Sequence, residues 1–430
     1  MNKNTLICKN QMGVFFYIKL IIYVAKLIFM YYNIIVIGLR RIYRMKMSIW
    51  MDDELSRLFE NICSEFNMTQ EEAINLFIHT TVNGDKIPFE SERALQFTLK
   101  TRKNFNSIYY RSCIDNVLRR HPKSEYERIR SKIQDDIFDL YALHDIYVNE
   151  YFEMRLYEKD KSEWADTYVS KSNINKYLKV VNKDGVKVDD KYGWYELLKP
   201  YYKRDVAYLR KNADKYEFMF FVKNHNKVVM KPIQDDDTDN IRIFRYDAIR
   251  KHDEFVDIVL SKCERGVIVE EYVEQDEEFK SFNEKSVNTV RVSVLKKADG
   301  EYIINKLLQV GEKDKLVDDV TKGAYRCALN QTTGVIETVY DIKGNDCSVD
   351  IMTEIDLVGK KVSDLNKLDD IVKQIMVELP GYNFIEFDFT KTCDGWVLMD
   401  VNEVPDITGM QLTLGYGIKH ELENIVAQEV

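Results

Sequence analysis

Near its C-terminus the chain alternates between apolar runs and turn-forming residues in a way that predicts a β-hairpin. One apolar run covers residues 384–389, a second covers residues 396–401, and residues 391–395 between them favour a turn. Shorter apolar runs predict three further strands, at residues 227–230, 267–269 and 286–295. Most of the first half of the chain has helical spacing instead, including a broad apolar face over residues 145–157.

The predicted hairpin carries acidic residues at defined positions. Glu386 and Asp388 are two residues apart and therefore share one face of the first strand, while Asp400 and Asn402 share a face near the end of the second. Carboxylate and amide oxygens are the ligands that Mg²⁺ takes beside a nucleotide. Two interpretations are open at this point: a magnesium site, or a sheet whose acidic outer face is simply solvated.

The other predicted strands place single charged residues at informative positions. Lys231 ends the first of them, where an ammonium group can clamp a phosphate. Glu270 and Glu271 end the second, where carboxylates can accept hydrogen bonds from a nucleoside. In the third, valines occupy alternate positions and Arg291 faces the other way, so one guanidinium lies on the polar face. Each signal has an ordinary alternative, because most such side chains are only solvated.

The first 44 residues form a separate, strongly apolar segment. Residues 13–39 are apolar and are followed by a basic cluster, which fits a membrane helix with a cytoplasmic basic end. Lys19 and Lys26 interrupt the run, however, and the segment contains no acidic residue. The alternative is that translation starts at Met45 or Met47 and that this segment is upstream sequence.

Residues 45–92 read as a small strand, helix, helix module. Residues 47–51 alternate as a strand, and residues 55–66 have helical apolar spacing. The second helix begins with Thr69 and Glu72, the spacing of a capping box. So short a module cannot bury its own core, and we expect it to form a homodimer.

Composition narrows the function classes only slightly. The chain has 430 residues and a net charge of −9, which argues against a general affinity for nucleic acid. Its seven cysteines are widely spaced with no CxxC pair, which excludes the usual zinc spacings and favours reduced thiols in the cytoplasm.

The hairpin residues resemble a known family. The hairpin is similar to the metal-binding hairpin of the ATP-grasp superfamily in three short motifs. These are F-D at Phe387, D-G at Asp394 and D-x-N-x-x-P from Asp400 to Pro405. The resemblance implies an α+β ATP-grasp fold in which antiparallel sheets of two subdomains cradle ATP. It implies Mg²⁺ bound by Asp388, Asp400 and Asn402.

Other stretches extend this resemblance to the sugar-transfer associated branch. SVNTVR at residues 286–291 and EYFEMRLYEKDKSEW at residues 150–164 are similar to that branch. On this basis the helical region covers residues 105–185 and the ATP-grasp domain residues 186–430. The resemblance implies phosphate binding by Lys191 and Lys231, nucleoside binding by Glu270 and Glu271, and catalytic charge stabilisation by Asn288 and Arg291.

The module at residues 45–92 resembles the ribbon-helix-helix antitoxins of the RelB/DinJ type, on the stretches DDEL at 52–55, FNMTQEEAINLFI at 66–78 and GDKIPFE at 84–90. In such proteins paired strands enter the DNA major groove. The outward positions, which the resemblance implies would contact DNA, are Lys46, Ser48 and Trp50.

Two functions are therefore expected from the sequence. The first is an ATP-dependent ligase that activates a carboxylate as an acyl-phosphate for attack by an amine or other nucleophile, in polysaccharide or cell-surface glycan biosynthesis. The alternative is a DNA-binding regulator with an inactive nucleotide-binding region. The loop at residues 234–240, QDDDTDN, lacks the glycines usual in that family and favours the regulator, whereas the metal hairpin favours the enzyme.

Overall fold

The computed structural model describes residues 59–60, 63, 68–75, 108–164, 166–209, 215–233, 241–250, 266–311, 323–348 and 356–429. The chain divides into two compact units, Met1–Lys103 and Asn104–Val430, and each is described by itself. Several sequence predictions lie outside the described residues: the membrane helix at 13–39, the strand at 47–51 with the DNA contacts of Lys46, Ser48 and Trp50, and most of the helix at 55–66. The glycine-poor loop at 234–240 lies outside them too.

In the first unit the described residues include the predicted capping box. The backbone N–H of Thr69 donates to the Glu72 carboxylate at 2.7 Å, and the backbone N–H of Glu72 donates to the Thr69 hydroxyl at 3.2 Å. These reciprocal bonds satisfy N–H groups that have no partner within a helix. The helix start predicted at Thr69 is confirmed.

The second unit begins with a helical region that has its own core. Its elements are α5 (Ile108–Leu118), η2 (Lys123–Glu125), α6 (Tyr126–His144), α7 (Val148–Glu153), η3 (Leu156–Glu158), α8 (Lys161–Trp164) and α9 (Lys171–Val181). The single helix predicted over residues 145–157 is wrong in its extent. Asp145 and Arg155 both have a φ of 54°, a left-handed conformation that ends a helix, so only Val148–Glu153 is α-helical.

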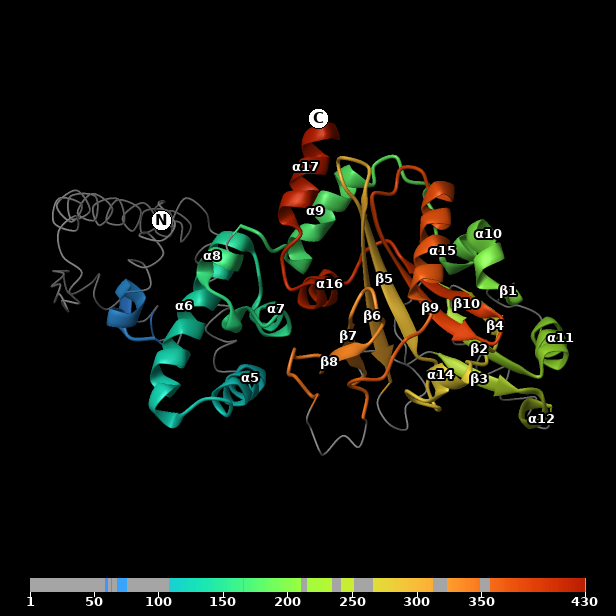
Figure 1. The fold of residues 1–430 in the computed structure, drawn as a ribbon, viewed down its shortest axis with the longest axis horizontal. Coiled ribbons are helices and arrows are strands. Elements are labelled where there is room, and N and C mark those ends of the chain that lie inside the picture. The colour runs from blue at the N-terminus through green and yellow to red at the C-terminus, as the bar shows by residue number, and fades with distance from the viewer. Residues whose placement is uncertain are drawn as a thin grey trace, which may run out of the picture. The chain divides into compact units, whose positions relative to one another are not determined.

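A small antiparallel sheet follows α10 (Lys191–Tyr202). Its strands are β1 (Val206–Leu209), β2 (Lys227–Pro232), β3 (Arg242–Arg245) and β4 (Val267–Glu271), in the order β1-β4-β2-β3. α11 (Lys215–His225) packs on one face of this sheet through Phe218 and Val222, against Val267 and Val269 of β4, with α12 (Tyr246–Ile249) beside it (Figure 1). The strands predicted around residues 227–230 and 267–269 are confirmed.

A larger antiparallel sheet contains the hairpin. Its strands are β5 (Thr289–Lys296), β6 (Tyr302–Val310), β7 (Tyr325–Leu329), β8 (Ile336–Tyr340), β9 (Phe384–Thr392) and β10 (Gly395–Asn402), in the order β10-β9-β5-β6-β7-β8. The remaining helices are α14 (Glu277–Lys280), α15 (Leu365–Glu378), α16 (Ile407–Leu414) and α17 (Lys419–Glu429). The predicted hairpin and the predicted α+β class with antiparallel sheets are confirmed.

The two faces of the six-stranded sheet differ completely in character. On one face, side chains such as Val292, Phe387 and Leu398 are fully buried in a core shared with α10 and α15. Helices α9, α16 and α17 pack together on the opposite side of the sheet (Figure 1), where Leu295 and Phe384 join their core. The central charged residues of β5, β9 and β10 lie on this second face. Among the described residues, no helix is both long enough and apolar enough to cross a membrane.

Candidate active site

The centre of the polar face is an arginine held between two acids. Arg291 of β5 lies directly opposite Asp388 of β9, and its Nε and Nη2 donate to the two carboxylate oxygens at 2.8 and 2.9 Å. The same Nε lies 3.2 Å from the carboxylate of Glu386. Glu386 and Asp388 are 1% and 8% exposed, so the acids predicted on one face are buried and not solvated. Ser293, on the same face of β5, donates to Glu386 at 2.7 Å.

A β-bulge brings the second strand's acid to the same face. Leu398 pairs with Phe389 and Asp400 pairs with Asp388, so Met399 is an extra residue with no partner in β9. In a regular strand, Leu398 and Asp400 would share a face, and Asp400 would enter the apolar core. The bulge shifts the alternation, so that Leu398 is buried in the core while Asp400 faces Asp388.

The three predicted metal ligands are thereby brought together. Asp400 lies opposite Asp388 in the ladder, and the side-chain amide of Asn402 donates to Asp388 at 3.3 Å. Lys191, the first residue of α10, donates to Asp400 at 2.9 Å. Burial alone would raise the pKa of Asp400, but Lys191 and then Lys231 outweigh it and lower that pKa. The acid is therefore held ionised, as a metal ligand must be.

The small sheet supplies a second set of charges. Lys231 of β2 lies 3.0 Å from the carboxylate of Glu270 on β4. Arg204, just before β1, also donates to Glu270, through Nε at 3.0 Å and Nη2 at 2.6 Å. Burial by itself would raise the pKa of Glu270, yet Arg204 and Lys231 together lower it.

A pocket lies between the two sheets where these groups meet. Lys191 and Tyr202 of α10, Ile268 and Glu270 of β4, and Asp400 of β10 are among its lining residues. The side chains are packed so closely that this pocket has no room for a water-sized molecule.

Arg204 was missed by the sequence analysis, although it connects the two sheets. Besides Glu270, its Nη1 donates to the carbonyl of Leu398 at 2.5 Å and its Nη2 to the carbonyl of Met399 at 3.2 Å. Those carbonyls belong to the bulge of β10. No local signal in the sequence marks Arg204, because its partners lie on other elements, Glu270 on β4 and the carbonyls of β10.

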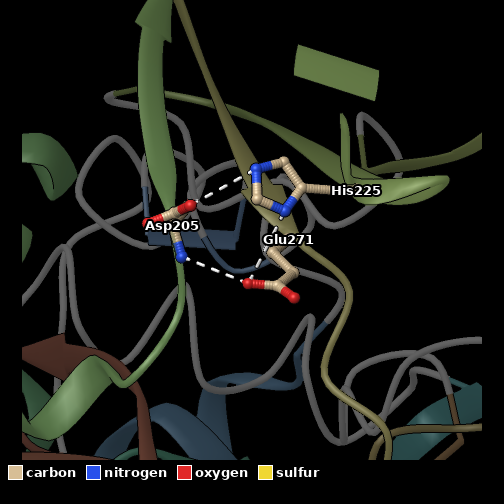
Figure 2. A group of neighbouring side chains, drawn as sticks. All are labelled: Asp205, His225 and Glu271. Atoms are coloured by element: carbon tan, nitrogen blue, oxygen red, sulfur yellow. Dashed lines mark hydrogen bonds and ion pairs between the residues drawn. The ribbon is translucent and has the colours of Figure 1, made fainter. Parts of the chain in front are cut away.

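Glu271 does not face the pocket. It alternates with Glu270 along β4 and lies on the opposite face, beside His225 at the end of α11 and Asp205 before β1. Figure 2 shows the imidazole between the two carboxylates, with Nε2 3.4 Å from Asp205 and Nδ1 3.7 Å from Glu271. One metal ion binds one nitrogen of a ring, so this arrangement suits a histidine linking two acids better than a metal centre.

Asn288 also lies away from the pocket. It is fully buried, and its side-chain amide donates to the carbonyls of Phe279 and Asn283 at 2.9 and 2.8 Å. Its carboxamide oxygen accepts from the hydroxyl of Ser286 at 2.9 Å. Asn288 thus fixes the loop that leads into β5 and positions Arg291 three residues later.

The polar face continues past Arg291 to residues that the sequence analysis did not single out. Asp406, the N-cap of α16, donates its backbone N–H to Glu386 at 3.2 Å and accepts from Arg326 of β7 at 2.6 Å. Burial opposes ionisation of Asp406, but Arg326 and then Arg291 outweigh it and hold its pKa well below the usual range. Burial raises the pKa of neighbouring Glu386 to about 7.

Known proteins resemble this chain only distantly. No curated protein matches the chain. Solved structures that match include D-cycloserine synthetase DcsG, at 12% identity and a TM-score of 0.33 over 56% of this chain and 70% of that one. Another is the D-alanine-D-alanine ligase from Helicobacter pylori, at 12% identity and a TM-score of 0.36 over 61% of this chain and 64% of that one.

A family model settles the assignment that these distant structures leave open. The model described as sugar-transfer associated ATP-grasp matches residues 147–427, well over half of the chain. The match begins in the helical region next to α7 and includes both sheets and the hairpin. The chain therefore belongs to the sugar-transfer associated ATP-grasp family.

Proposed function

We propose that this protein is an ATP-dependent ligase that activates a carboxylate as an acyl-phosphate for attack by an amine or other nucleophile. One observation carries the proposal: Asp388, Asp400 and Asn402 meet on adjacent strands, with Arg291 and Lys191 bonded directly to the two acids. Oxygen ligands and cations in such proximity suit a metal-bound triphosphate. The family match supports the same class of reaction.

The three oxygen ligands fit Mg²⁺. Two carboxylates and one amide would supply part of an octahedral set, and phosphate oxygens and water would supply the rest. When bound, the ion would offset negative charge on the phosphates. We assign Lys191 and Lys231 to phosphate oxygens, since each is now paired with a carboxylate that lines the pocket.

Arg291 is assigned to the reacting carboxylate and the transferred phosphoryl group. Its guanidinium lies on the polar face beside the predicted metal ligands, and its Nη1 is not used in the bidentate bond to Asp388. A fixed cation there would stabilise charge that develops during transfer. Glu270 is assigned to the nucleoside end of the pocket, whereas Glu271 would act there only through its backbone.

The biological setting rests on the family description alone. The description of the family as sugar-transfer associated suggests a role in polysaccharide or cell-surface glycan biosynthesis. We also keep residues 45–92 as an antitoxin-like dimerisation or DNA-binding module, supported only by the capping box at Thr69. An electrophoretic mobility shift of the full chain with DNA, compared with a variant carrying Lys46→Ala and Trp50→Ala, tests that second role.

The test of the ligase proposal is calorimetric titration of ATP into the full chain, with and without Mg²⁺. We expect magnesium-dependent binding in the micromolar range, about −8 kcal/mol. The double variant Asp388→Ala with Asn402→Ala should lose the magnesium-dependent part. Glu271→Gln is the matched control, because that acid lies on the other face of its sheet and should leave ATP affinity unchanged.

Two results would contradict the assignment. Unchanged magnesium-dependent affinity in the double variant would remove the metal ligands proposed here. Absence of ATP binding at millimolar concentration in the wild-type protein would instead favour the regulator with an inactive nucleotide-binding region.

A further inference from the structure

The polar face holds a second buried arginine whose donors are incompletely used. Arg326 is 5% exposed, and among the described residues its Nε and Nη1 have no hydrogen-bond acceptor. Only Nη2 is used, in the 2.6 Å bond to Asp406. Buried polar groups in proteins are almost always hydrogen-bonded, and an unbonded guanidinium N–H is costly.

The neighbouring acid, Glu153, does not accept a hydrogen bond from the unused donors of Arg326. Nη1 lies 3.9 Å from the carboxylate of Glu153 on α7, which is an ion pair but too long for a hydrogen bond. That carboxylate already interacts with Lys171 at 3.1 Å and Thr408 at 3.1 Å. The structure therefore leaves donors, and not acceptors, available at this position, so a ligand here would have to supply oxygen acceptors.

The backbone next to Arg326 is kept free of a side chain. A Cβ added to Gly409 of α16 would lie 3.3 Å from Nε of Arg326 and 2.7 Å from the carboxylate of Asp406. Gly409 has no positive φ that would call for glycine, since its backbone is helical. Glycine at this position therefore lets the backbone of α16 lie close to Arg326 and Asp406, and a side chain here would push against both groups.

Arg326 and Arg291 lie on either side of Asp406 on the polar face of the sheet. They lie on the same face of the sheet, since Arg291 pairs with Leu307 and Arg326 pairs with Gln309, two residues further along β6. Strand spacing and rise place their Cα atoms about 12 Å apart. Asp406 lies between the head groups, because it bonds Arg326 and its N–H donates to Glu386, the partner of Arg291.

We propose that Arg326 binds a second carboxylate of the substrate, so that the ligase acts on a short dicarboxylic acid. This rests on the proposed function for the reacting carboxylate, which Arg291 would hold at the metal end. Arg326 would bind the other carboxylate by donating from the two unused donors, Nε and Nη1. A cation on each side of Asp406 fits a molecule with acidic groups at both ends.

The test compares dicarboxylates with monocarboxylates of equal length on the full chain. Succinate and glutarate are titrated calorimetrically against butyrate and valerate, first without nucleotide and then with Mg-ATP. The wild-type protein should bind each dicarboxylate about tenfold more tightly or better, since a charge-assisted pair is gained. Arg326→Lys keeps a cation for Asp406 but removes the unused donors, and should reduce this preference to about twofold or less.

The control variant is Lys306→Gln. Lys306 is also a buried cation paired with a carboxylate, Asp369 at 2.6 Å, but it lies on the apolar face of the same sheet. It should keep the preference for dicarboxylates, so a loss confined to Arg326→Lys is not a general effect of destabilisation. Gly409→Ala should weaken dicarboxylate binding and leave Mg-ATP affinity unchanged.

The outcomes separate the two proposals. The role of Arg326 is overturned if the wild-type protein binds the two acid classes equally or binds no carboxylate at all. It is also overturned if the preference for dicarboxylates survives in Arg326→Lys or is lost equally in Lys306→Gln. If such a result accompanies normal Mg-ATP binding, the ligase proposal stands. If an Arg326-dependent preference appears without Mg-ATP binding, the dicarboxylate site stands and the ligase proposal falls.

Discussion

The two faces of the six-stranded sheet are built by different physical rules. The apolar face is a continuous core in which Val290, Val292 and Phe387 are fully buried against α15 and its neighbours. The polar face is almost as well buried at its centre, but its contacts are directional pairs such as Arg291 with Asp388. Burial of apolar area is non-directional and tolerates variation, whereas a buried charge must have a correctly placed partner.

The two faces should therefore fail in different ways. Truncating a core side chain lowers stability roughly in proportion to the apolar area that it no longer buries, and the effect stays local. Removing a buried charge leaves its partner buried and uncompensated, so one change affects several neighbours. Stability is concentrated on one face and chemistry on the other, within the same strands.

The largest effect on stability is expected from Phe387→Ala. The ring is fully buried in the apolar face, so its removal should cost about 3–5 kcal/mol in the free energy of unfolding. Chemical denaturation measures this loss. At denaturant concentrations below the unfolding transition, the affinity of the variant for Mg-ATP should be unchanged, although Phe387 is adjacent to Asp388. A loss of Mg-ATP affinity that parallels the loss of stability would show that the two faces do not act independently.

Arg204→Met should have the next largest effect. Glu270 would keep Lys231 but lose the arginine whose Nε and Nη2 both donate to one of its carboxylate oxygens, and the bulge carbonyls of β10 would lose their donor. We expect a loss of about 3 kcal/mol in stability, at the low end for breaking a buried pair. Unlike Phe387→Ala, it should also weaken ATP binding, measured by calorimetry. Lys203→Met, at the exposed neighbouring position, is the control.

Arg291→Lys tests the polar face without removing its charge. The two parallel bonds to Asp388 cannot both form with an ammonium group. The rate of carboxylate-dependent ADP release should fall about 10²-fold, or about 2.7 kcal/mol, with a smaller change in stability. Lys296→Arg, at the end of the same strand, should leave the rate unaltered. An equal decrease in both variants would argue against a specific role for Arg291.

The smallest expected effect is a change in pH dependence. The pKa of Asp406 is held below its usual range, so its ionised form stabilises the fold above the unfolded-state value of about 3.9. That stabilisation is lost as the pH falls below this value, because the unfolded state then binds more protons. The Asp406→Asn variant should therefore unfold at a lower temperature than the wild-type protein at neutral pH. Its unfolding temperature, measured by thermal scans, should also change less with pH between about pH 5 and 3. A profile parallel to that of the wild-type protein would contradict this.

The amino-acid pattern alone was enough to predict the apolar face and the strands β2, β4, β5, β9 and β10, but not β1, β3, β6, β7 and β8. Alternation in β5 and β9 fixed which residues enter the core, because hydrophobic burial depends only on the period of the pattern. The same alternation placed Arg291 and Asp388 on the other face. The resemblance of the hairpin to the ATP-grasp superfamily indicated the family, which the match over residues 147–427 confirms.

Which polar groups meet could be learned only from the packed fold. The bulge at Met399 reverses the facing of Asp400, and no local pattern in β10 predicts an extra residue. Arg204 and Arg326 find their partners across 66 and 80 residues of sequence, on other elements. Glu270 and Glu271 look equivalent in the sequence but lie on opposite faces of β4. A buried charge is defined by its partner in space, and that partner is set by the packing of whole elements.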